Sequence, residues 1–161
     1  MLITDEEVAV KAAQAGAAVV AARYGAPLAR FPKSGGDFAT SADLEAEQAI
    51  LDVIRTARPD DSVTGEESGR TGSGAAERMW LVDPLCGTLN YAARNMLVAV
   101  NVALRVGPDI TVAASSDPFA RRSLLDGRRS RVPPPRRRGR AAHTVARHAP
   151  GRRQPRPAVP Q

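Results

Sequence analysis

The chain has 161 residues, a length that fits one domain, and 23 Lys and Arg against 17 Asp and Glu give a net charge of +6. Thirteen of the basic residues and one acidic residue lie in residues 121–161, so residues 1–120 carry a net charge of −6. The basic balance therefore belongs to the tail and does not indicate nucleic-acid binding by the rest of the chain. A single cysteine excludes an intramolecular disulfide.

The N-terminus lacks the basic and apolar pattern of a secretory leader, and no apolar stretch reaches the roughly 20 residues that span a bilayer. We therefore expect a cytoplasmic protein with no membrane partner.

The first expected element is a helix that begins at the capping box Thr4-x-x-Glu7 and runs to about Tyr24-Gly25. Gly25 and Pro27 end it. One apolar stripe at helical spacing comprises Val8, Ala12, Ala15, Val19 and Ala22. So much alanine predicts close packing against a second helix.

Residues 31–40 predict a glycine-containing loop with room for a short hairpin. Thr40 or Ser41 then caps a second helix of about 42–57, which Pro59 closes. Its expected apolar face is Leu44, Ile50, Leu51 and Ile54. Its expected solvated side is Glu45, Glu47, Asp52 and Arg55.

A short strand is expected at residues 62–64, and the glycines of residues 69–76 predict a flexible surface loop. Trp80, Leu81 and Val82 read as the end of a buried strand that Asp83-Pro84 stops. The apolar run 97–106 predicts a strand buried on both faces, with residues 110–114 as its antiparallel partner.

After about Ala120 the composition changes to Arg, Pro, Gly and Ala without aromatic residues. Such a segment buries too little apolar surface to offset its ordering entropy, so residues 121–161 are predicted to be a disordered tail.

The stretch that follows Trp80 carries the strongest chemical signal. Asp83 ends a strand, and Gly87 and Thr88 then permit a turn from which a helix can start. A carboxylate suits a hard cation and free backbone N–H groups suit a phosphate, so the pattern favours a metal–phosphate site. When this stretch is taken alone, an ordinary strand followed by a turn explains its residues at least as well as a metal–phosphate site does.

Three motifs together resemble the inositol monophosphatase family of magnesium-dependent, lithium-sensitive phosphatases. The signature W-x-x-D-P-x-D-G-T-x-N-[FY] is matched by Trp80, Asp83, Pro84, Gly87, Thr88, Asn90 and Tyr91. The motif G-E-E-[ST] is present as Gly65, Glu66, Glu67 and Ser68, and a K-x-x-x-D-x-x-T-x-x-D run as Lys33, Asp37, Thr40 and Asp43. The resemblance covers roughly residues 5–120.

The resemblance implies an α+β fold, with two N-terminal helices packed on an antiparallel sheet, as the first part of a layered α/β sandwich. It implies Mg²⁺ ligands at Glu66, Asp83 and the Leu85 carbonyl, with Glu66 also catalytic. Thr88 and Asp43 would orient and polarise the nucleophilic water. The Gly87-Thr88 backbone would face the phosphate, Lys33 would act from a mobile loop, and Glu67 would be a supporting or surface residue.

Two departures from the family pattern bear on activity. Cys86 stands where the family has an aspartate ligand, and a mostly neutral thiol prefers softer ions than Mg²⁺. Nothing in residues 121–161 resembles the family's second half, whose W-D-x-A-type motif supplies a further metal ligand. We therefore expect a truncated chain in which hydrolysis of a small phosphomonoester, such as inositol or histidinol phosphate, is impaired.

Other interpretations stay open at this point. The chain can be an inactive fragment or pseudoenzyme with a binding role, and the resemblance also allows a homodimer. Nucleic-acid binding through the basic tail is disfavoured because no aromatic residues interleave its arginines. The change of composition near residues 120–126 is also what a shifted reading frame in a GC-rich gene would give.

Overall fold

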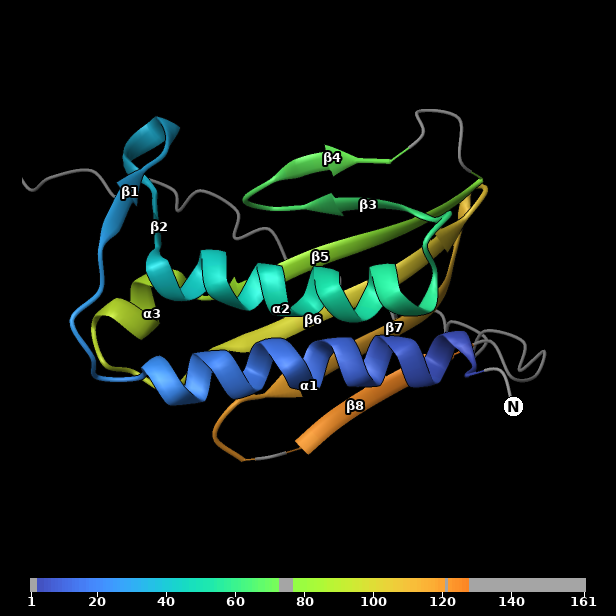
Figure 1. Cartoon of the computed structure of the whole chain (residues 1–161). Helices are drawn as coiled ribbons and strands as arrows, with labels where there is room; N and C mark the ends of the chain where they lie inside the picture. Colours follow the sequence, from blue (N-terminus) through green and yellow to red (C-terminus); the bar gives the residue numbers. More distant parts are fainter. Residues whose placement is uncertain (1–2, 73–76, 121, 128–161) are drawn as a thin grey trace, which may run out of the picture. The chain divides into compact units, whose positions relative to one another are not determined.

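Two antiparallel helices lie side by side on one face of a six-stranded sheet (Figure 1). The helices are α1 (Asp5–Arg23) and α2 (Ser41–Ala57), and the strand order is β4-β3-β5-β6-β7-β8. The computed structural model describes residues 3–72, 77–120 and 122–127. The expected α+β class, with two N-terminal helices packed on a sheet, is confirmed.

Helix α1 begins at the capping box that the sequence predicts. The Thr4 hydroxyl accepts the Glu7 N–H, and the Glu7 carboxylate accepts the Thr4 N–H. Its buried residues are Val8, Ala9, Ala12, Ala13, Gly16, Ala17 and Val20. Of the predicted stripe, Val8 and Ala12 are buried, Ala15 and Val19 are half-buried with Val19 packed against the core, and only Ala22 is exposed. The prediction failed at Ala22 because alanines lie on every side of this helix and give little contrast between its faces.

A hairpin and a cap lead into α2. Strands β1 (Arg30–Pro32) and β2 (Phe38–Thr40) pair antiparallel around the short turn η1 (Ser34–Gly36), and Thr40 caps the helix. Ile50, Leu51 and Ile54 are buried as predicted. Two assignments on this helix were wrong: Leu44 is 41% exposed, whereas Glu47, expected in solvent, is 2% exposed.

The sheet is mixed and not antiparallel as expected from the sequence, because the pairing of β3 with β5 is parallel. Strand β3 (Ser62–Gly65) pairs antiparallel with β4 (Gly69–Thr71) on one side and parallel with β5 (Arg78–Cys86) on the other. Residues 69–71 were expected to be loop. Because they form a strand, the chain reverses twice before β5, which therefore runs in the same direction as β3.

Strand β5 continues beyond the point where the sequence placed its end. It runs through Asp83-Pro84 to Cys86, with a shift of register against β6 (Ala99–Val106) between Asp83 and Cys86. Pro84 lies inside this irregularity, where a missing N–H is tolerated.

Buried and half-buried residues alternate along β6, so the prediction of a strand buried on both faces was wrong. Val100, Val102 and Leu104 are buried, while the residues between them are half-buried. Helices α1 and α2 both cover one face of the sheet, which is the face of the buried residues Val100, Val102 and Leu104 (Figure 1). Because side chains alternate along a strand, the half-buried residues between them point to the opposite face.

Two further strands complete the sheet. Strand β7 (Asp109–Asp117) pairs antiparallel with β6 as predicted, and β8 (Arg122–Gly127) pairs antiparallel with β7. Residues 122–127 were assigned to the disordered tail, so that boundary was placed too early. The remaining tail, residues 128–161, lies outside the described residues. Among the described helices, none is long and apolar enough to cross a bilayer.

Candidate functional site

Parallel pairing brings the predicted site residues to one edge of the sheet. Strands β3 and β5 run side by side in the same direction, so the turn at residues 66–68 and the carboxyl end of β5 meet at that edge. The β1–β2 hairpin, the N-terminus of α2 and the short helix α3 (Thr88–Ala92) lie at the same end of the domain (Figure 1).

Thr88 is held between two of the predicted groups. Its hydroxyl lies 2.8 Å from Oδ1 of Asp43 and 3.1 Å from the Leu85 carbonyl oxygen. The other Asp43 oxygen, Oδ2, accepts the Thr40 N–H at 2.8 Å and the Thr40 hydroxyl at 2.5 Å. Asp43 therefore caps its helix and orients Thr88 at the same time.

Asp83 carries a carboxylate oxygen with unused bonding capacity. Its Oδ1 is buried and makes no hydrogen bond to any described residue, and its Oδ2 accepts a long 3.4 Å bond from Asn101 Nδ2. Burial and, more weakly, the negative charge of Glu66 raise the pKa of Asp83 above its usual value, against the bond from Asn101. A cation at this carboxylate would relieve both effects.

Lys33 reaches the turn at residues 66–68 from the hairpin. Its Nζ lies 3.0 Å from Glu66 Oε1 and 2.7 Å from Glu67 Oε1. Burial acts to lower the pKa of Lys33, but its bonds to Glu67 and Glu66 outweigh burial and raise it. The Glu67 side chain is 5% exposed, so the prediction that it could be a surface residue was wrong.

Glu47 is the site residue that the sequence missed. From α2 its Oε2 accepts the Glu67 N–H and its Oε1 accepts the Ser68 N–H, both at 2.8 Å. It stands four residues after Asp43, and so on the same side of the helix. That spacing, with an acidic residue at both positions, was the available signal.

Cys86 is exposed at the end of β5, beside Asp83. The negative charge of Asp83, together with burial, raises the pKa of the Cys86 thiol. A thiol that resists ionisation does not fit as a ligand for Mg²⁺. Gly87 follows with φ of +99°, and a Cβ there would come within 3.0 Å of the Leu97 carbonyl, so the turn requires glycine.

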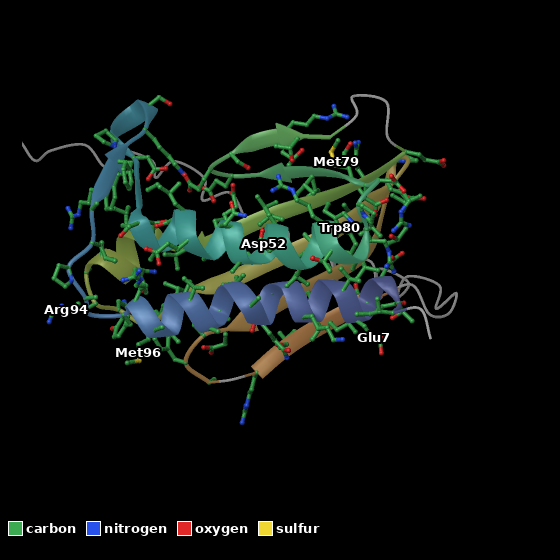
Figure 2. The ribbon with its side chains drawn as sticks, viewed as in Figure 1. Glu7, Asp52, Met79, Trp80, Arg94 and Met96 are labelled. Carbon is green, nitrogen blue, oxygen red and sulfur yellow. The ribbon has the colours of Figure 1, made fainter. Side chains whose placement is uncertain are left out.

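The remaining residues of the signature support the structure. Trp80 is fully buried under α2 (Figure 2), and its Nε1 donates to Asp61 at 2.8 Å. Asn90 donates to the Leu97 carbonyl, and the Tyr91 hydroxyl donates to the Val20 carbonyl. The signature thus joins two site residues, Asp83 and Thr88, to a set of packing residues.

A hollow of about 580 Å³ lies over the sheet face that points away from the helices. Its lining is mostly aliphatic or small and comes from β3 and from strands β5 to β8, with Glu66 and Asp83 at its wall. Of the carboxylates of the candidate site, Glu66 and Asp83 therefore border this space.

The donor set fits part of a magnesium site. Across residues 3–72, 77–120 and 122–127, no group of three or more His, Cys, Asp or Glu side chains is arranged to hold a metal ion. The buried, unpaired Asp83 oxygen and the neighbouring Glu66 are nevertheless the hard ligands that Mg²⁺ prefers, and this ion keeps several waters.

Comparison with known proteins gives consistent matches. The model of the inositol monophosphatase family matches residues 2–132. A protein of Streptomyces griseus named glucose-1-phosphate thymidylyltransferase is 39% identical over 97 residues, which are 60% of this chain and 37% of that protein. The Nus factor SuhB of Salmonella typhimurium is 36% identical over 114 residues, 70% of this chain and 43% of that protein.

A solved structure extends the match to the fold. The inositol monophosphatase from Anabaena aligns with a TM-score of 0.64 and 29% identity, over 76% of this chain and 43% of that one. The chain thus spans about two fifths of the length of the relatives that it matches.

Proposed function

The chain belongs to the inositol monophosphatase family, and we propose that it takes part in magnesium-dependent hydrolysis of a small phosphomonoester, inositol or histidinol phosphate being the leading candidates. The observation that carries this proposal is the Asp83 carboxylate, whose buried Oδ1 has no partner among the described residues and whose pKa is raised partly by the charge of Glu66. A buried unpaired charge is costly, so a cation is the natural partner.

Glu66, Asp83 and the Leu85 carbonyl are the proposed ligands of Mg²⁺. When bound, this ion neutralises charge on the phosphoryl group and favours an attacking hydroxide. Asp83 and Glu66 supply the negative charge that holds the ion, and the hollow beside them gives the substrate access.

Asp43 and Thr88 are the proposed pair that orients the attacking water. The carboxylate of Asp43 lies 2.8 Å from the Thr88 hydroxyl, so the Thr88 proton points away from the substrate and an oxygen lone pair stays free to accept from water. The backbone N–H of Gly87 or Thr88 would contact the phosphate, and Lys33 would balance charge from the hairpin.

Cys86 reduces this activity in the proposal, because it replaces a hard carboxylate with a neutral thiol next to Asp83. The reaction named for the Streptomyces griseus relative is a different one. We do not propose it, because Glu66, Asp83 and Thr88 fall on the phosphatase pattern.

Phosphate release tests the proposal. Inositol 1-phosphate, histidinol phosphate and p-nitrophenyl phosphate would be assayed with Mg²⁺, using the unaltered chain, Cys86→Asp, and Cys86→Asp combined with Asp83→Asn. We expect a low rate that rises in Cys86→Asp and falls to background in the double variant. A rate that does not depend on Mg²⁺ or on Asp83 would contradict the proposal.

A further inference from the structure

We infer that Glu47 is a positioning residue that fixes the turn at residues 66–68 and thereby aims the Glu66 carboxylate at the cation. The inference rests on the proposed function for the role of Glu66. It assigns a task to a carboxylate that the family signature does not include and that the sequence placed in solvent. The Glu47 side chain is 2% exposed, and both of its oxygens bond to the backbone of this turn.

The backbone is held at three consecutive residues. The Glu66 N–H donates to the Val82 carbonyl of β5 at 3.1 Å. The next two N–H groups, of Glu67 and Ser68, donate to the two oxygens of Glu47 at 2.8 Å each. With both flanking peptides fixed in this way, the Cα of Glu66 has little freedom, and its side chain leaves the turn in a defined direction.

Gly65 shows how closely the Glu47 carboxylate approaches the strand. A Cβ built at Gly65 would lie 2.5 Å from Cδ of Glu47 and 2.6 Å from each of its oxygens. Only glycine therefore leaves room for this carboxylate under the turn. The G-E-E-S motif is therefore matched to Glu47. Its first residue, Gly65, leaves space for the Glu47 carboxylate, and the backbone N–H groups of its last two residues, Glu67 and Ser68, donate to that carboxylate.

A carboxylate suits this place better than a neutral group. It offers two acceptor oxygens to two N–H donors, and bonds to an ionised acceptor are stronger than neutral ones. Glutamine offers one acceptor oxygen, and its amide nitrogen would face the other N–H group donor to donor. Glu47→Gln therefore keeps the size of the side chain but loses one of the two bonds.

Helix α2 connects the two halves of the site. Asp43 orients Thr88 from the first turn of the helix, and Glu47 holds the turn at residues 66–68 from the second turn. Both side chains leave the same face of one rigid element, so their spacing sets the position of the Glu66 turn relative to Thr88.

Amide hydrogen exchange on the full chain tests the contact without metal or activity. We expect slow exchange at the Glu67 and Ser68 amides although they lie in a turn. In Glu47→Gln, one of these two amides should exchange at least about tenfold faster than in the unaltered chain. Glu45→Gln, a change of the same kind at an exposed position of the same helix, should leave both unchanged. Fast exchange at both amides of the unaltered chain overturns the inference, whether or not the variant folds.

Binding of Mn²⁺, followed by electron paramagnetic resonance as a substitute for Mg²⁺, tests the consequence. Glu47→Gln should weaken it about 10- to 100-fold, as loss of a group that orients a metal ligand does. Glu45→Gln should not weaken it. Val8→Ala, a buried change in α1, should not weaken it either, which separates positioning from a loss of stability.

The outcomes separate this inference from the proposed function. If Asp83→Asn weakens Mn²⁺ binding and Glu47→Gln does not, the proposed site stands and the positioning role is overturned. If the unaltered chain and Asp83→Asn bind equally weakly, the proposed metal site is wrong. The exchange result then decides alone whether Glu47 fixes the turn.

Discussion

The hydroxyl of Thr88 lies 2.8 Å from Oδ1 of Asp43, a residue 45 positions earlier in the chain. This contact joins the first turn of α2 to the turn that follows β5. Asp43 is 1% exposed, and its second oxygen accepts both the N–H and the hydroxyl of Thr40. One buried carboxylate therefore satisfies a helix cap and a proposed catalytic hydroxyl together.

Asp43→Ala should lower the free energy of unfolding by about 1–3 kcal/mol, because the buried donors of Thr40 lose their acceptor. Urea unfolding can be followed by the fluorescence of Trp80, the one tryptophan of the chain. Asp52→Ala on the same helix, where the carboxylate bonds Gln48 at the surface, should stay within about 0.5 kcal/mol. Equal losses in the two variants would mean that the Thr40 contact does not stabilise the fold.

Asp43→Asn should separate the two tasks of this residue. An amide can still accept from Thr40 through its oxygen, while its nitrogen donates to Thr88. The Thr88 proton would then point to the Leu85 carbonyl, and one of the two hydroxyl lone pairs would accept from the new amide, so no carboxylate would polarise this hydroxyl toward water. We expect stability closer to that of the unaltered chain than Asp43→Ala shows, with phosphate release in the Cys86→Asp background lost. Full activity would exclude the proposed role of the pair.

Cys86→Asp should tighten Mg²⁺ binding on the order of tenfold, or about 1.4 kcal/mol. The new carboxylate adds negative charge beside Asp83 and Glu66, so the metal-free variant should be less stable and gain more from Mg²⁺. Calorimetry and thermal unfolding with and without Mg²⁺ measure both effects. Cys86→Ser, which supplies a neutral oxygen, is the matched control, and equal affinities in all three proteins would place residue 86 away from the cation.

The sequence predicted the fold well where local signals are strong. The capping box at Thr4 and the strand that follows Gly107-Pro108 were both placed correctly. The prediction was less accurate where secondary structure depends on pairing with a neighbouring strand. Residues 69–71 are one glycine, one arginine and one threonine, a run too short and polar to predict a strand, yet they form β4 because β3 offers an edge for pairing. Residues 122–127 pair with β7 for the same reason.

The candidate site divides in the same way. Asp83, Thr88 and Glu66 were found because they stand in motifs of fixed spacing. Glu47 was missed because acidic residues on helices usually face solvent, and its partners are backbone N–H groups some 20 residues later, which carry no sequence signal. Leu44 was misplaced for a related reason: apolar residues on helices usually face the core, but this one is exposed.

Stability should fall at acid pH partly through Asp5. Burial alone would raise the pKa of this carboxyl, but its bonds to Arg78 and Arg58 outweigh burial and lower it. The contribution of ionised Asp5 to the free energy of unfolding is therefore complete above the pKa of this residue in the unfolded chain, about 3.9. It is lost as the pH falls through the lower pKa that Asp5 has in the folded chain. Urea midpoints at pH 5 and pH 2.5 should differ less in Asp5→Asn than in the unaltered chain or in the exposed variant Asp52→Asn. An unchanged difference would contradict this account.

Gly16 allows a prediction in which two effects of opposite sign compete. In an exposed helix, Gly→Ala stabilises by about 1 kcal/mol through helix propensity. At Gly16, however, an added Cβ would lie 2.7 Å from Cδ1 and 2.9 Å from Cγ1 of the fully buried Ile50, and 3.0 Å from Cγ1 of Val100. Overpacking of this kind costs about 1–3 kcal/mol. We expect Gly16→Ala to be destabilising, which reverses the sign that propensity alone gives.

A double-mutant cycle with Ile50→Val attributes that loss to its cause. Valine lacks Cδ1, the atom nearest to the added Cβ, and so makes room for alanine at position 16. Gly16→Ala should therefore cost less in the Ile50→Val background than alone, with a coupling free energy of about 0.5–3 kcal/mol. Urea unfolding of the four proteins, followed by Trp80 fluorescence, measures it. Additive effects would mean that Val100 or the helix backbone, and not Ile50, sets the close approach of α1 to the core.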